Sequence, residues 1–139
     1  MTSGYITILL VEDNPGDADL VRERLEETTS ARFRVRHAKQ LGAALQLFGK
    51  EVFDVILLDL SLPDVQGLDT VRSVRAACAD VPVVVLTGLQ DEGVGLEAIR
   101  EGAQDYLVKD QIDGPLLARA LRYAMERKRA EEALRQAEG

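Results

Sequence analysis

The chain has 139 residues, 46% of them hydrophobic, and a formal net charge of −7 at pH 7, which fits one folded domain and argues against a disordered chain or a nucleic-acid binder with a basic face. Its single cysteine, Cys78, excludes an internal disulfide and is typical of a reducing compartment. The sequence shows neither an apolar run near the ~20 residues of a membrane span nor a signal-peptide pattern, so we expect a cytoplasmic protein with no membrane partner.

Strand and helix patterns alternate along the chain. Apolar runs, or an alternation of apolar and polar residues, predict strands at 5–11, 33–37, 54–59, 82–86 and 105–108. Apolar residues at helical spacing predict helices at about 14–25, 41–48, 68–78, 91–101 and 113–137. The first helix should begin at Asn14, whose side chain can cap it, with Pro15 in the first turn and Asp17 near the positive end.

This alternation predicts an α/β fold, because a parallel strand returns to its sheet through a crossover helix. The strands at 5–11, 54–59 and 82–86 are almost continuously apolar, as expected in the middle of a sheet covered on both faces. The strand at 33–37 alternates and should lie at an edge. We therefore predict a doubly wound, flavodoxin-like, five-stranded parallel sheet in the order 2-1-3-4-5, with an extended C-terminal helix.

The C-terminal helix is longer than a small domain needs, since 113–137 would span roughly 37 Å. We divide the chain into a domain at 1–125 and a helical extension at 126–139, which could form a coiled-coil connector to a partner or a second copy. The alternative is a helix that packs on its own sheet and has a solvated end. A mainly apolar stripe with +4, +3 spacing carries this interpretation: Leu116, Ala120, Tyr123, Arg127, Ala130, Leu134 and Ala137.

Polar residues follow the predicted strands where each strand ends. Glu12 and Asp13 follow the first strand, Asp59 ends the third, Thr87 follows the fourth and Lys109 follows the fifth. Because the carboxyl ends of parallel strands meet at one edge of the sheet, these side chains should lie together, where open α/β sheets bind ligands.

Such an acidic cluster needs a cation or a proton. Two carboxylates ~5 Å apart repel each other by roughly 3 kcal/mol at an effective dielectric near 20. Glu12, Asp13 and Asp59 are hard oxygen ligands without a neighbouring His or Cys, so they favour Mg²⁺ over zinc or iron. Helix capping by Glu12 or Asp13 alone would leave Asp59 and Lys109 unexplained.

A carboxylate can also attack phosphorus and form an aspartyl phosphate. Asp59, at the end of a buried central strand, is the candidate nucleophile. Lys109 would offset the negative charge of the phosphoryl group, and Thr87 could donate a hydrogen bond to it.

The sequence resembles the response-regulator receiver domains of two-component signalling. The resemblance covers about residues 6–125, and a segment near the N-terminus, 11–17, is similar to the receivers found beside phytochromes and in multidomain sensor proteins. It rests on these segments: Leu10-Val11-Glu12-Asp13-Asn14; Asp59 with Pro63 and Gly67 downstream; Leu86-Thr87-Gly88; and Asp105-Tyr106-Leu107-Val108-Lys109.

The resemblance implies that Asp59 accepts a phosphoryl group from a histidine kinase, a phosphotransfer protein or a small phosphodonor. It implies Mg²⁺ held by Asp13, Asp59 and the backbone carbonyl of Ser61, with Glu12 acting through water. Thr87 and Tyr106 would form the switch pair, and the fourth and fifth helices would bind a downstream domain or effector. On this basis the chain is a phosphorelay component and not an enzyme.

The chain departs from the family pattern at one position. The family usually has proline after the lysine, whereas Asp110 follows Lys109 here, so we expect a trans peptide bond or a changed loop between Lys109 and Gly114. His37, the only histidine, should have a structural role, and Cys78 should pack in the core.

Other functions remain open from the sequence. The chain could be a phosphorylation-independent dimerisation module, or the N-terminal receiver of a larger sensor or kinase protein. An aspartyl-phosphate hydrolase is disfavoured, because Ser61 stands where such enzymes need a second Asp. A flavin mononucleotide protein is disfavoured, because Glu12 and Asp13 would repel the phosphate.

Overall fold

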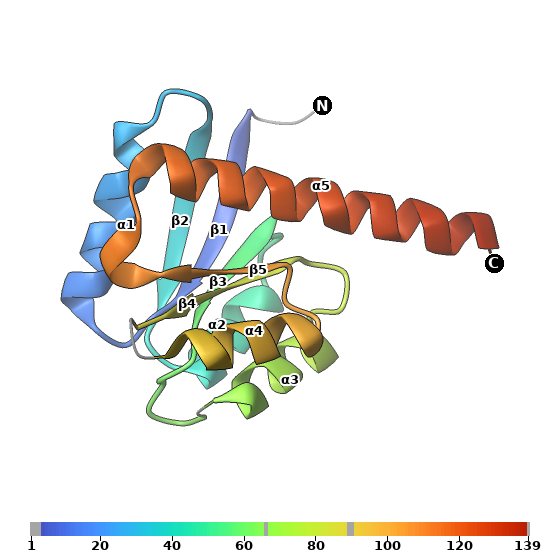
Figure 1. The fold of residues 1–139 in the computed structure, drawn as a ribbon, viewed down its shortest axis with the longest axis horizontal. Helices are drawn as coiled ribbons and strands as arrows, with labels where there is room; N and C mark the ends of the chain where they lie inside the picture. Colours follow the sequence, from blue (N-terminus) through green and yellow to red (C-terminus); the bar gives the residue numbers. More distant parts are fainter. Residues whose placement is uncertain (1–3, 66, 89–90, 139) are drawn as a thin grey trace.

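The computed structural model describes residues 4–65, 67–88 and 91–138 and shows a three-layer α/β architecture (Figure 1). Its strands are β1 (Tyr5–Val11), β2 (Arg32–Ala38), β3 (Val55–Asp59), β4 (Val83–Thr87) and β5 (Asp105–Val108). Its helices are α1 (Pro15–Glu27), α2 (Leu41–Phe48), α3 (Leu68–Ala77), α4 (Glu92–Arg100) and α5 (Gly114–Glu138), with a short 3₁₀ turn, η2, at Lys109–Gln111.

The sheet has the predicted order and direction. All four strand pairings are parallel, and the order is β2-β1-β3-β4-β5. Every residue of β3 and β4 is buried, whereas successive side chains along β2 alternate between exposed and half-buried up to the buried Ala38. The doubly wound fold and the edge position of β2 are therefore confirmed, and the strand ends differ from the prediction by one residue at most.

Two apolar clusters hold the helices on the sheet. One face packs against α1 and α5 through residues such as Ile8, Leu57 and Leu121, all without exposed surface. The opposite face packs against α2, α3 and α4 through residues such as Leu58, Val71 and Ala98. The alternation along each central strand sends neighbouring side chains into different clusters, which explains why these strands are apolar throughout.

Helix α1 begins as the sequence predicts. The Asn14 side chain accepts a hydrogen bond from the backbone N–H of Asp17 at 2.9 Å, and Pro15 occupies the first turn. Ala18, Val21 and Leu25 then face the sheet and are buried. This capping fixes the first turn of α1 directly beside the carboxyl edge of β1.

Helix α5 packs on a face different from the one the apolar stripe predicts. Its buried side chains include Leu117, Leu121, Ala124 and Lys128, whereas the predicted stripe is mostly exposed, with Tyr123 at 54% and Leu134 at 63%. The first half of the helix packs on its own sheet, which is the alternative that the sequence offers, but Leu117 and Leu121, outside the stripe, fill the core beside Ala120. From Tyr123 onward the stripe faces outward.

The distal half of α5 extends past the sheet and is tied to it on one side (Figure 1). Arg127 donates hydrogen bonds to the side-chain and backbone oxygens of Gln104 at 3.2 and 3.0 Å. The Gln104 amide in turn donates to Glu131 at 2.9 Å. One loop residue before β5 therefore holds two successive turns of α5, and the helix runs without a break from Gly114 to Glu138.

Candidate functional site

The carboxyl edge of the sheet gathers the polar residues that the sequence places at strand ends. Glu12 and Asp13 follow β1, Asp59 closes β3, Thr87 closes β4, and Lys109 follows β5. Since β1 and β3 are neighbours although α1, β2 and α2 separate them in sequence, this edge is the switch point where the connections diverge to opposite faces.

Three carboxylates form the centre of the site. Glu12, Asp13 and Asp59 each offer an oxygen within 4.8 Å of the other two. Glu12 is fully buried and Asp59 is 3% exposed, whereas Asp13 is open to solvent. The predicted cluster thus has a buried side and an open side. It suits a hard divalent cation that keeps part of its water shell.

Lys109 lies among carboxylates. Its ammonium nitrogen is 2.8 Å from Glu12 Oε1, 3.0 Å from Asp17 Oδ2 and 3.5 Å from Asp59 Oδ1. Burial alone would lower the pKa of Lys109, but the contacts with Glu12, Asp59 and Asp17 outweigh burial and raise it. The lysine therefore carries a positive charge at any physiological pH.

Glu12 is the most perturbed acid of the site. Burial and the neighbouring Asp59 carboxylate raise the pKa of Glu12 to about 7, although Lys109 acts in the opposite direction. Its Oε2 accepts a hydrogen bond from the backbone N–H of Asn14 at 3.3 Å. Its buried Oε1 has only the ionic contact with Lys109, which lacks hydrogen-bond geometry. This incompletely satisfied oxygen leaves a place for another cationic partner.

A cavity of about 330 Å³ opens beside Asp59. Ser61, Thr87, Gly88 and Lys109 are among its lining residues. The backbone N–H of Ser61 donates to Asp59 Oδ1 at 3.3 Å, and the buried Thr87 hydroxyl donates to the Leu107 carbonyl at 3.5 Å. The Asp59 carboxylate therefore borders a space large enough for a small anionic group, with the Lys109 ammonium and the Thr87 hydroxyl among its lining groups.

Tyr106 lies two strands' width from Asp59 and packs against α4. A Cβ atom added to Gly95 would lie 2.6 Å from Cγ and Cδ2 of the Tyr106 ring. Gly95 is buried, whereas Gly93, in the same helix, has open space around it. The sequence alone suggests that both glycines soften α4 or lie on a solvent face; for Gly95 the structure shows instead a close approach to the ring.

The loop after Lys109 accommodates the missing proline without a cis bond. No peptide bond among residues 4–65, 67–88 and 91–138 is cis. Lys109 begins the 3₁₀ turn η2, and Gly114 then opens α5. The expectation of a trans peptide bond after Lys109 is confirmed.

Sequence reasoning missed two neighbours of the acidic cluster. Asp17 was predicted to act on the dipole of α1, yet its carboxylate contacts Lys109. His37 Nε2 lies 2.6 Å from the backbone oxygen of Glu12, so the histidine borders the site through the main chain and supports the turn after β1. The structural role expected for His37 fits this contact.

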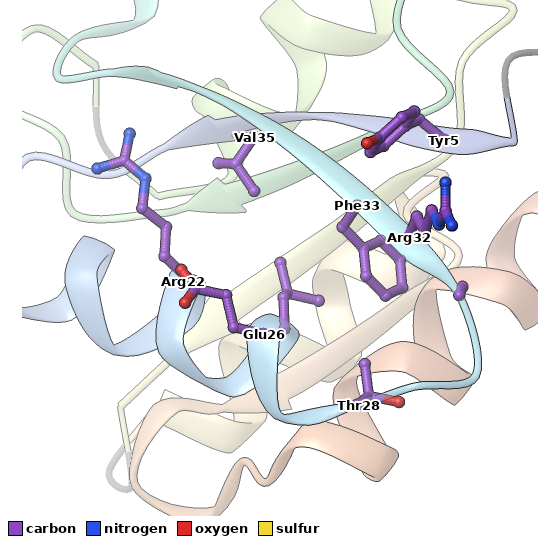
Figure 2. Close-up of a pocket in the computed structure, with 9 residues that line it drawn as sticks. Tyr5, Arg22, Glu26, Thr28, Arg32, Phe33 and Val35 are labelled. Carbon is purple, nitrogen blue, oxygen red and sulfur yellow. The ribbon is translucent and has the colours of Figure 1, made fainter.

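A second, wider hollow of about 500 Å³ lies between α1 and the edge strand β2, away from the acids (Figure 2). Its walls combine Phe33 and Val35 with the charged side chains of Arg22, Glu26 and Arg32. The hollow is open to solvent, and Glu26 is the single carboxylate among its lining residues, in contrast to the three carboxylates at the sheet edge. We therefore place the functional site at the carboxyl edge.

The comparisons with known proteins give the class of the chain. Residues 8–122 match the response regulator receiver domain family, and the chain belongs to that family. A methanogenesis regulatory protein of Methanothrix harundinacea is 37% identical over 112 residues, covering 77% of this chain and 24% of its own length. The response regulator protein PilR of Pseudomonas aeruginosa is 34% identical over 129 residues, covering 90% and 28%.

The cell cycle transcriptional regulator CtrA of Caulobacter vibrioides is 33% identical over 113 residues, covering 81% of this chain and 47% of its own length. The chain thus spans between about a quarter and a half of these relatives.

Solved structures agree with this assignment. A response regulator receiver domain protein of Clostridium thermocellum superimposes with a TM-score of 0.77 at 26% identity, covering 90% of this chain and 98% of that one. The signal receiver domain of an HD domain-containing protein of Pseudomonas fluorescens gives a TM-score of 0.80 at 25% identity, covering 96% of each chain.

In the part of the chain that the structure describes, no helix is both long and apolar enough to span a bilayer.

The raised pKa of Glu12 predicts a pH-dependent stability of the metal-free protein. The folded state binds the Glu12 proton up to about pH 7, whereas the unfolded chain releases it near its ordinary value of 4.5. Stability from this group is therefore complete below pH 4.5 and is lost as the pH rises through 7. Between pH 5.5 and 8 in EDTA, wild type should lose about 2 kcal/mol more than Glu12→Gln in urea unfolding. Parallel pH profiles of the two proteins would contradict this.

The contact between Gly95 and Tyr106 predicts opposite effects for two matched substitutions in α4. Gly93→Ala should stabilise the protein by up to about 1 kcal/mol, because alanine favours a helix over glycine. Gly95→Ala should instead cost about 1–3 kcal/mol, because the new methyl group overlaps the Tyr106 ring. Urea unfolding gives the two free energies, and the NMR shifts of the Tyr106 ring should move for Gly95→Ala only. Equal stabilisation by both substitutions would contradict this prediction, because it would show that the Tyr106 ring moves away from the new methyl group at little cost.

Proposed function

We propose that the chain is a phosphorelay receiver in which Asp59 accepts a phosphoryl group in a Mg²⁺-dependent reaction. The observation that carries this proposal is the arrangement of Glu12, Asp13 and Asp59 at one sheet edge, with Lys109 3.5 Å from Asp59 and a cavity of about 330 Å³ beside it. Membership of the receiver family supports the same chemistry.

In the proposed reaction, an Asp59 carboxylate oxygen attacks the phosphorus of a phosphohistidine or a small acyl phosphate. A P–O bond to Asp59 forms as the P–N or P–O bond to the donor breaks, and the donor leaves with the electron pair of that bond. Lys109 would offset the charge on the phosphoryl oxygens, and the Thr87 hydroxyl would turn from the Leu107 carbonyl towards them.

The residues present fit Mg²⁺. Asp13, Asp59 and the backbone carbonyl of Ser61 would hold the ion, with Glu12 acting through water. The buried Glu12 oxygen without a hydrogen bond, and the purely oxygen-based donor set, favour this hard cation. Bound there, the ion would neutralise the carboxylates and the incoming phosphoryl charge.

The proposed partners follow from the same chemistry. The donor would be a histidine kinase or a phosphotransfer protein, and the downstream domain or effector would bind the surface formed by α4, β5 and α5. Thr87 and Tyr106 would connect the two, since Thr87 borders the cavity and Tyr106 packs against α4. The chain would then act in the cytoplasm as a switch and not as an enzyme, and possess no nucleic-acid surface of its own.

A second candidate function is dimerisation, or connection to a following module, through α5. The exposed apolar side chains of Tyr123 and Leu134 on the outward stripe favour this candidate. It is compatible with phosphorylation, because the distal part of α5, residues 126–138, would relay a change at the receiver into a larger sensor or kinase protein or into a second copy.

The proposed chemistry predicts a mass gain that depends on Asp59 and on the cation. After incubation with acetyl phosphate and Mg²⁺, intact mass spectrometry should show one added phosphoryl group on wild type. Asp59→Asn, and wild type with EDTA, should show less than a tenth of that gain, because the nucleophile or the charge neutralisation is missing.

Asp54→Asn is the matched control for the charge change, since Asp54 precedes the same strand at its opposite end. It should gain the phosphoryl group like wild type. No gain on wild type in the presence of bound Mg²⁺ would overturn the proposed function.

A further inference from the structure

We infer that Asp17 is a positioning residue that competes with the phosphoryl group for Lys109 and so slows the phosphorylation of Asp59. This inference rests on the proposed function, since it concerns the control of that same site. It concerns the hydrogen bond from Lys109, in the turn after β5, to Asp17 of α1, two residues that are 92 positions apart in the sequence.

The geometry around Lys109 distinguishes Asp17 from the other acids. The ammonium has contacts with three carboxylates: it lies 2.8 Å from Glu12 Oε1, donates a hydrogen bond to Asp17 Oδ2 at 3.0 Å, and lies 3.5 Å from Asp59 Oδ1. Asp17 is the one of these three acids that lies outside the carboxylate cluster of the site. The lysine is therefore held by Glu12 and Asp17 more closely than by the nucleophile.

The backbone keeps Asp17 in that position. Its N–H donates to the Asn14 side chain in the capped first turn of α1, and Pro15 restricts the same turn. The Asp17 carboxylate is therefore held at the end of a short side chain on a well-defined turn, and it does not need to reach far to meet Lys109. Few rotamers of Asp17 are lost on forming the contact.

Lys109 lies between two hollows of the protein surface and lines both of them. On one side it borders the cavity shared by Asp59 and Thr87, where a phosphoryl group would sit. On the other side it borders a small apolar recess lined by Asp17, Leu20 and Ile112. A phosphoryl group on Asp59 would have to recruit the ammonium from Asp17, so part of that interaction is lost on the way to the transition state.

The size of the effect follows from the exposure of the pair. The Asp17 side chain is 39% exposed and the Lys109 side chain 20%, so solvent weakens their attraction. Partly exposed pairs of this kind change an equilibrium by about two- to fivefold. Removal of the Asp17 charge should therefore raise the rate constant for phosphorylation by about that factor.

Asp19 provides a matched control on the same helix. Its side chain is 70% exposed and its ion-pair contact is a 3.9 Å approach to Arg22. Asp19→Asn removes the same charge from α1, two residues away, without touching Lys109. A difference between Asp17→Asn and Asp19→Asn therefore reports the contact and not the net charge of the helix.

The experiment measures the rate of phosphorylation of wild type, Asp17→Asn and Asp19→Asn by acetyl phosphate. Quenched samples are followed by intact mass, each protein at a saturating Mg²⁺ concentration, at about 0.05 M and 1 M NaCl. We expect Asp17→Asn to react two- to fivefold faster than both other proteins at 0.05 M NaCl. The advantage should be smaller at 1 M NaCl, because salt weakens the partly exposed pair of Asp17 and Lys109.

The outcomes separate this inference from the proposed function. If wild type reacts and Asp17→Asn matches Asp19→Asn at 0.05 M NaCl, the competition is refuted while the receiver chemistry stands. Slower reaction of Asp17→Asn would show that Asp17 holds Lys109 in a productive place, which also refutes competition. A wild type that never gains a phosphoryl group would overturn the proposed function together with this inference.

Discussion

The charge balance around Lys109 is the interaction on which the rest of the site depends. A sheet edge that brings Glu12, Asp13 and Asp59 together is electrostatically costly unless positive charge enters it. In the protein alone, Lys109 supplies that charge and the pKa of Glu12 rises, so a proton supplies the remainder. A divalent cation would displace that proton. In the proposed function, Mg²⁺ binding, phosphorylation and the position of Lys109 would therefore be linked by one local charge balance.

The sheet is what makes this balance possible. Parallel strands buried on both faces place their carboxyl ends at one edge. Asp59 is the last residue of the buried central strand β3, so its backbone is fixed at that edge. The apolar helix side chains that cover the two faces carry no charge. They exclude water from Glu12, however, and burial is the main reason for its raised pKa. Core packing thus acts on the chemistry through desolvation.

The sequence predicts the sheet and the central residues well because both follow strict periodic patterns. Strand ends and the acids after β1 and β3 are local features, and the parallel topology brings them together by necessity. The face of α5 could not be predicted from spacing, because Leu116 and Leu117 begin two stripes of similar quality and only the shape of the core selects Leu117. The contacts of Asp17 with Lys109 and of Gly95 with Tyr106 join distant segments, so no local pattern indicates them.

These long-range contacts connect the two ends of the proposed switch. On one side of Asp59, α1 holds Lys109 through Asp17. On the other side, Thr87 closes β4, and the neighbouring β5 carries Tyr106 against Gly95 of α4. Gln104, two residues before Tyr106, holds the distal turns of α5 through Arg127 and Glu131. A movement of Tyr106 would therefore act on a strand whose preceding residue, Gln104, is tied to α5. This chain of contacts would connect the outward part of the α5 stripe with the proposed phosphorylation site without any change in the core of the sheet.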